Sequence, residues 1–245
     1  MPKRIAFCFV LGLFVSSTSA FADIWSAVGN FPTVTSLTSP ANGVWSYGYA
    51  STLSPVDFVL DQTATADYFG DGHAAGFYTP TGGDALPTVL KNTTGTTLNP
   101  EAVTIGPWPA DLLLLHPGPT GDYSVVRFTA PVSATYAVTG EFVAMGNYSG
   151  VTDDSVSLTG PGPSSTSLYS TTSTSSPHIF SLDQAMTAGQ SLDFAVGLGP
   201  QGQFNYDSTG FNATITTPEP GFYSLFALCL TITALIAAIW RKKSA

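Results

Sequence analysis

Short segments rich in β-branched and aromatic residues, separated by turn residues, recur along residues 23–217 of the 245-residue chain. The clearest is Tyr123–Thr129, YSVVRFT, and the stretch after it alternates around Tyr136 and Val138. Further segments of this kind cover residues 43–50, 56–61, 75–79, 88–92, 111–116, 154–160, 178–183, 191–198 and 210–217. No stretch of this region keeps a helical period beyond two turns. The pattern therefore predicts an all-β fold, an antiparallel β-sandwich or jelly roll.

Two polar stretches interrupt this pattern. Residues 91–102, KNTTGTTLNPEA, are a candidate internal linker between an N-terminal sub-region and the rest. We expect a single domain nevertheless, because Trp45 and Tyr47 are the kind of large residue that a shared core requires. Residues 161–177, mostly Ser and Thr, predict either an edge strand with flanking loops or a solvated segment.

The N-terminus has the pattern of an export signal. Lys3 and Arg4 precede the apolar stretch Ile5–Val15, and the small-x-small tripeptide AFA follows. These features predict a signal peptide at residues 1–22, cleaved after the tripeptide, and hence an exported protein that engages the export machinery. The alternative, a retained membrane helix, is disfavoured because the apolar stretch is too short to span a bilayer.

The C-terminus has the pattern of a membrane segment. Residues 221–240 contain no charge, and a helix of this length would span about 30 Å, the thickness of a bilayer's hydrocarbon core. Arg241, Lys242 and Lys243 begin a basic tail, residues 241–245, which the positive-inside rule places in the cytoplasm. We expect one transmembrane helix here, since the alternative, a buried core helix, needs no basic stop.

A tripeptide precedes this segment and gives the end of the chain a resemblance. Pro218, Glu219 and Pro220, then the apolar helix and the basic tail, resemble the PEP-CTERM sorting signal of Gram-negative bacteria, here residues 218–245. The resemblance implies an exosortase as processing partner. It also implies a precursor anchored in the inner membrane and a mature protein at the cell surface or outside the cell.

Charge narrows the classes of partner. Between residues 23 and 217 the only cations are Lys91 and Arg127, against fifteen Asp and Glu residues, a formal charge of −13. Nucleic acid is therefore excluded as a partner, whereas uncharged sugars and cations remain compatible. We expect Arg127 to form a structural salt bridge with Asp111 or Asp122.

Cysteine placement excludes further chemistry. Cys8 and Cys229, the only cysteines, fall in the predicted signal peptide and the predicted membrane helix. The exported region therefore has no disulfide, no cysteine nucleophile and no cysteine metal ligand, and it must be held together by packing alone.

Two longer segments carry a second resemblance. LLLLHPGPTGDYSVVRFTAPVSATYAVTGEF and LDQAMTAGQSLDFAVGLGPQGQFNYDSTGFNATI are similar to segments of bacterial surface jelly-roll domains, many of them in PEP-CTERM proteins. Ala134 stands where those domains usually have Gly. The resemblance implies a sandwich like that of carbohydrate-binding modules, and a fold of this kind does not fix the ligand.

Aromatic residues in turn-rich segments are the candidate sugar-binding residues, because a pyranose presents an apolar face to a ring. Trp108 lies in the proline-flanked segment GPWPAD, Tyr148 in GNYSG and Tyr206 in QFNYDS. For Trp108 the alternative is an aromatic plug over one end of the sandwich. His116, before Pro-Gly-Pro, is expected to hydrogen-bond within that turn.

Acidic turns offer a candidate calcium site at Asp153, Asp154 and Asp207, since calcium prefers oxygen ligands. Such turns also form without metal, because Asp accepts hydrogen bonds from its own backbone. A glycoside hydrolase would need a pair of carboxyl groups, and none of the acids stands in a recognisable catalytic motif.

The sequence thus predicts a non-catalytic, exported surface or extracellular-matrix protein that is associated with exopolysaccharide and sorted by an exosortase. One alternative is a carbohydrate-binding module with a defined glycan ligand. The second alternative, a glycoside hydrolase, is the least favoured.

Overall fold

The computed structural model describes residues 22–32, 41–100, 105–145, 151–160, 162 and 164–217. Asp23–Pro218 gather into one compact unit. The predicted signal peptide up to Phe21 and the predicted sorting signal at 218–245 lie outside the described residues. Over the ranges given above, no helix is long and apolar enough to cross a membrane.

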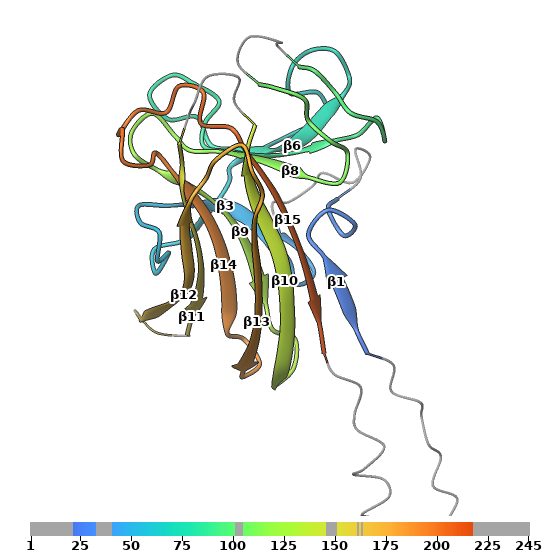
Figure 1. Ribbon diagram of the computed structural model, residues 1–245, viewed down its shortest axis with the longest axis vertical. Helices are drawn as coiled ribbons and strands as arrows, with labels where there is room; N and C mark the ends of the chain where they lie inside the picture. The colour runs from blue at the N-terminus through green and yellow to red at the C-terminus, as the bar shows by residue number, and fades with distance from the viewer. Residues whose placement is uncertain are drawn as a thin grey trace, which may run out of the picture. The chain divides into compact units, whose positions relative to one another are not determined.

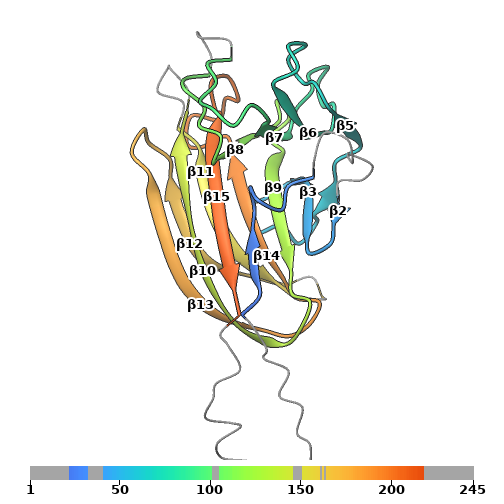
Figure 2. The same ribbon diagram turned by 90° about the vertical axis from the view of Figure 1, so that its right-hand side faces the viewer.

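Strands form two antiparallel sheets that pack face to face (Figures 1 and 2). The eight strands of the first sheet are β1 (Ile24–Ser26), β5 (Thr63–Thr65), β6 (Ala74–Tyr78), β7 (Thr88–Asn92), β8 (Leu113–His116), β10 (Ala134–Ala144), β13 (His178–Met186) and β15 (Thr209–Thr216). The seven strands of the second sheet are β2 (Ala41–Asn42), β3 (Trp45–Ala50), β4 (Val59–Leu60), β9 (Tyr123–Thr129), β11 (Asp153–Thr159), β12 (Ser165–Thr172) and β14 (Ser191–Gly197). The predicted all-β fold with antiparallel pairing is confirmed.

The last eight strands, β8 to β15, form four nested antiparallel pairs, as if one long hairpin had been folded over. β11 pairs with β12, β10 with β13, β9 with β14 and β8 with β15, so that each pair encloses the one before it. Successive pairs alternate between the two sheets. This nesting is the connectivity of a jelly roll, and it gives the strand order β13-β10-β15-β8 in one sheet and β12-β11-β14-β9 in the other.

The N-terminal strands extend both sheets rather than forming a second domain. β3 pairs with β9, where Trp45 lies opposite Phe128, and β7 pairs with β8, where Val89 lies opposite Leu115. The candidate linker at 91–102 therefore begins in β7 and leads to the neighbouring strand of the same sheet. The Ser/Thr-rich segment forms β12, an edge strand of the second sheet, as one of the two interpretations predicts.

Aromatic rings fill the space between the sheets. Phe194 of β14 and Phe211 of β15 join the two layers with ring centroids 5.0 Å apart, and Phe142 lies 5.2 Å from Phe211. Trp45 and Phe128 meet edge to face at 5.3 Å. Because aromatic contacts of this kind add stability beyond the burial of area, they help to hold a domain that contains no disulfide.

β8 is buried on both faces, which explains the run of four leucines at 112–115, three of them in this strand. Leu113 and Leu115 point into the core between the sheets. Leu112 and Leu114 belong instead to a second buried cluster with Trp108 and other residues on the outer side of the first sheet. A strand covered on both faces needs no alternation of apolar and polar residues.

A strap, residues 51–58 between β3 and β4, covers the outer face of the second sheet. Arg127 of β9 holds it, because its Nη2 donates to the Pro55 carbonyl at 3.0 Å and its guanidinium lies 4.1 Å from the Phe58 ring centroid. Arg127 also binds both carboxylate oxygens of Asp193, at 2.5 and 2.9 Å. The prediction that Arg127 pairs with Asp111 or Asp122 is therefore wrong. Asp193 follows from strand register, because β9 and β14 place it directly opposite Arg127.

We expect Arg127→Met to destabilise the domain by about 3 kcal/mol, because Asp193 is fully buried and would lose its cation. Urea unfolding at pH 7 measures this loss. The double variant Arg127→Met/Asp193→Leu should recover most of it, since no unpaired buried charge remains. A single variant as stable as the wild type would contradict this role for the ion pair.

Candidate functional site

A pocket of about 480 Å³ opens on the outer side of the first sheet, over β7 and β8. We call it the β8 pocket. Loops from β5 to β6, from β6 to β7 and from β14 to β15 form its walls. Its lining consists of Tyr68, Phe69, Asp84, Ala85, Leu86, Thr88, Leu90, Ile105, Leu114, His116, Phe204, Asn205, Tyr206 and Ser208. β15 starts beside this pocket and ends, next to the start of β1, at the opposite end of the sandwich (Figures 1 and 2).

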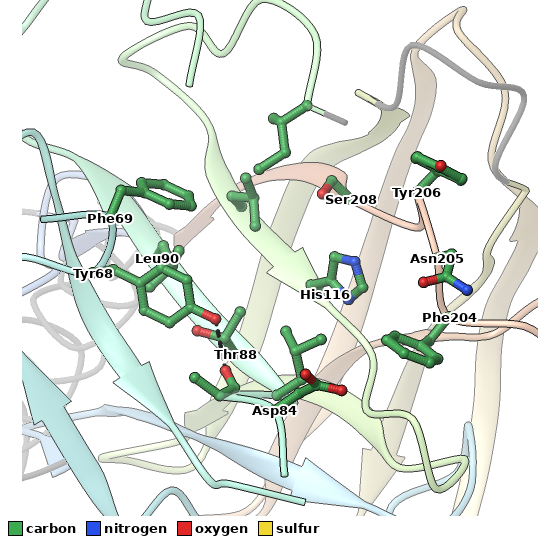
Figure 3. Close-up of a pocket in the computed structure, with 14 residues that line it drawn as sticks. Tyr68, Phe69, Asp84, Thr88, Leu90, His116, Phe204, Asn205, Tyr206 and Ser208 are labelled. Atoms are coloured by element: carbon green, nitrogen blue, oxygen red, sulfur yellow. Dashed lines mark hydrogen bonds between the residues drawn. The ribbon is translucent and has the colours of Figure 1, made fainter. Parts of the chain in front are cut away.

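Aromatic side chains stand on two sides of the β8 pocket. Figure 3 shows Tyr68 and Phe69 on one side, Phe204 and Tyr206 on the other, and His116 between them. The Tyr68 hydroxyl donates to the Ala85 carbonyl at 2.7 Å, which fixes this ring against the neighbouring loop. The two sides therefore offer rings to an apolar ligand face, separated by polar groups.

His116, at the end of β8, supplies the central polar group. Its Nδ1 lies 2.9 Å from the Pro117 carbonyl, an acceptor, so Nδ1 carries the proton and Nε2 keeps a lone pair. Burial lowers the pKa of His116, against smaller opposing effects of the Pro117 carbonyl and Asp84. The imidazole is therefore neutral at pH 7. The hydrogen bond expected within the Pro-Gly-Pro turn is confirmed.

Tyr206 is the one predicted ligand-binding residue that the structure places in the β8 pocket. The residue is 39% exposed at the rim, and its backbone has a φ of 69°. A positive φ is costly for a bulky residue, and strain of this kind gathers at functional sites. The loop thus holds this ring at the pocket in spite of a backbone cost.

Trp108 does not serve as a sugar platform in this structure. Its side chain is fully buried, and its Nε1 donates to the Leu112 carbonyl at 2.9 Å. Its backbone forms a bridge with Leu98. The indole is thus a buried plug, as the alternative interpretation predicts, but it covers the outer side of the first sheet rather than one end of the sandwich. Tyr148, the third candidate, lies outside the described residues.

The three candidate calcium ligands do not form a metal site. Asp154 is buried, and its carboxylate accepts hydrogen bonds from the hydroxyls of Thr152 and Ser173. Asp153 and Asp154 are consecutive residues of β11, so their side chains point to opposite faces of the sheet. Burial raises the pKa of Asp154 to about 7 and that of Asp207 to about 7. Asp153 begins β11 and is half-buried. Among the residues that the structure describes, no group of three His, Cys, Asp or Glu side chains could hold a metal ion.

A second pocket of about 480 Å³ lies beside β10 and contains the carboxyl groups of Asp111 and Glu141. Its other lining residues include Pro107, Pro109 and Met145, and no aromatic residue is among the described residues that line it. Asp111 is exposed to solvent. The described part of this pocket thus offers two carboxyl groups and no ring on which a pyranose could stack.

Most of the β8 pocket could not be predicted from the sequence. Tyr68, Phe69, Asp84 and Phe204 come from three separate loops and share no motif. The only signals were a histidine at the end of a strand and an aromatic residue in QFNYDS. Sheet register brings these loops together, since β7 pairs with β8 and β8 with β15.

No protein-family model and no curated protein matches the sequence. Among solved structures, the N-terminal cellulose-binding domain of Cellulomonas fimi β-1,4-glucanase C is 16% identical, over 47% of this chain and 86% of that one, with a TM-score of 0.30. TmCBM61, solved with β-1,4-galactotriose, is 10% identical over 53% and 87%, with a TM-score of 0.33. Murine APRIL is 10% identical over 64% and 94%, with a TM-score of 0.28. Scores this low establish neither a detailed common fold nor a common ligand.

Proposed function

We propose that this chain is a non-catalytic carbohydrate-binding protein whose glycan ligand occupies the β8 pocket. One observation supports the proposal above all: aromatic rings on two sides of a pocket flank a neutral histidine and a carboxylate. A pyranose has apolar C–H faces that stack on rings and equatorial hydroxyls that need hydrogen-bond partners. The arrangement offers both.

The polar groups of the pocket suit sugar hydroxyls. The Asp84 carboxylate and Nε2 of His116 accept hydrogen bonds, and the Asn205 amide and the Ser208 hydroxyl can also donate them. Binding rather than hydrolysis is favoured, because a glycosidase needs two carboxyl groups across the bond and Asp84 is the only acid that lines this pocket in the described chain.

We further propose that the protein is exported and sorted to the cell surface or the surrounding matrix by an exosortase. The signal-peptide pattern at residues 1–22 and the PEP-CTERM-like pattern at 218–245 support this proposal. Within the domain, the Asp23 amide donates to Thr217 Oγ1 at 3.2 Å, and the Thr217 amide donates to the Asp23 carbonyl at 3.1 Å. Chain entry and exit thus meet at the end far from the β8 pocket (Figure 1), and attachment there would leave the pocket accessible.

We expect the protein, purified from the cells that produce it, to bind specific glycans on an array. Phe204→Ala and His116→Ala should each lower the affinity for the best ligand by about tenfold or more in calorimetry. The first removes a stacking surface and the second a hydrogen-bond acceptor. Ile179→Ala is the matched control, since this apolar side chain is 74% exposed on β13 and lies outside the β8 pocket. Silence across the array, or unchanged affinity in both pocket variants, would contradict glycan binding at this site.

Sorting predicts a shortened mature protein. Mass spectrometry of the protein from cells and medium should find Asp23 as its first residue and a C-terminal residue upstream of Trp240. An intact Trp240–Arg241 end in the mature form would rule out this processing.

A further inference from the structure

Both cations of the domain are held in internal contacts. Between residues 23 and 217 the sequence contains only Lys91 and Arg127 as basic residues. Lys91 Nζ donates to the Val28 carbonyl at 2.8 Å, and burial lowers the pKa of Lys91. Arg127 is bound to Asp193 and to the strap. Neither side chain lines the β8 pocket.

The β8 pocket itself carries a negative charge without a counter-charge. Asp84 is the only Asp or Glu among the residues that line it in the described chain, and no Lys or Arg is among them. His116 could become a cation, but burial lowers its pKa and keeps it neutral at pH 7. A ligand in this pocket therefore meets one carboxylate, neutral hydrogen-bonding groups and rings.

We propose, on the basis of the glycan-binding function above, that the β8 pocket selects uncharged sugars and rejects acidic ones, and that Asp84 is the specificity-determining residue. A uronic acid would bring a second carboxylate near Asp84, in a site that has no cation to pair with it. Like charges at close range repel, and recognition of a sugar carboxylate or sulfate normally uses Arg or Lys. An uncharged sugar meets no such cost, because its hydroxyls can donate to Asp84 and to Nε2 of His116.

The overall charge of the domain acts in the same direction. The formal charge of −13 lowers the local concentration of any polyanion at low ionic strength, while an uncharged glycan is unaffected. This long-range effect is screened within about 10 Å at 0.1 M salt, whereas the repulsion by Asp84 acts at contact. The two effects can therefore be separated by salt and by substitution.

The test uses matched oligosaccharides that differ only by oxidation at C6: mannotriose against trimannuronate, cellotriose against its triuronate, and galactotriose against trigalacturonate. Affinities of the protein from its producing cells are measured by calorimetry at low salt and at 0.15 M salt. We expect the neutral member of any pair that binds to be favoured by about tenfold or more at 0.15 M salt. A uronate that binds as tightly as its neutral partner would overturn the inference and leave glycan binding intact. If none of the six oligosaccharides binds and no glycan on the array binds either, the proposed function itself is contradicted.

Asp84→Asn should narrow the preference for the neutral sugar by about fivefold or more, since it removes the opposing charge and keeps the shape of the side chain. Asp183→Asn is the matched control, because it makes the same change in net charge on an exposed position of β13 outside the pocket. If both variants reduce the preference for the neutral sugar equally, the selectivity comes from overall charge and the role of Asp84 is overturned. No narrowing in Asp84→Asn would overturn it as well.

Discussion

Strand β15 links the parts of this domain, because its two edges pair with three other strands. One edge pairs with β10 along its length, and the other pairs with β8 at its start and with β1 at its end. Its inward residue Phe211 meets Phe194 of the opposite sheet, so the same strand also joins the two layers. The loop that leads into β15 forms one wall of the β8 pocket. At the other end of the strand, Thr217 is hydrogen-bonded to Asp23, where the domain begins. Site and termini are thus placed at opposite ends by one element.

Much of the fold could be predicted from the sequence because strand alternation is local. Tyr136 and Val138 alternate with the smaller residues Ala137 and Thr139 and face the core, and Tyr123–Thr129 forms β9 with the predicted bounds. The alternation of apolar and polar residues did not predict the second buried layer, which lies outside the first sheet. Trp108, in a proline-flanked segment, has the pattern of an exposed loop ring, yet Leu112 and Leu114 provide an apolar face that it covers. The pairing of β6 with β7 and of β7 with β8 creates this face, because it brings Ala74, Leu90 and Leu114 together.

The β8 pocket and the Arg127–Asp193 ion pair were not predicted from the sequence for the same reason, because both depend on the register between distant segments. Arg127 and Asp193 are 66 residues apart and meet because β9 and β14 place them opposite each other. Tyr68 and Phe204 stand at one pocket because β8 lies between β7 and β15. The composition was nevertheless informative, since a domain with only two basic residues that uses both internally has none left for an anionic ligand.

The central claim is that a glycan occupies the β8 pocket, and an NMR titration of backbone amides with the tightest neutral glycan tests it most directly. The account predicts that amide shifts of Asp84, His116, Phe204 and Ser208 move with ligand, while those of Arg127 and Asp193 on the opposite sheet stay in place. Shifts that gather on the outer face of the second sheet, with the β8 pocket unchanged, would contradict it.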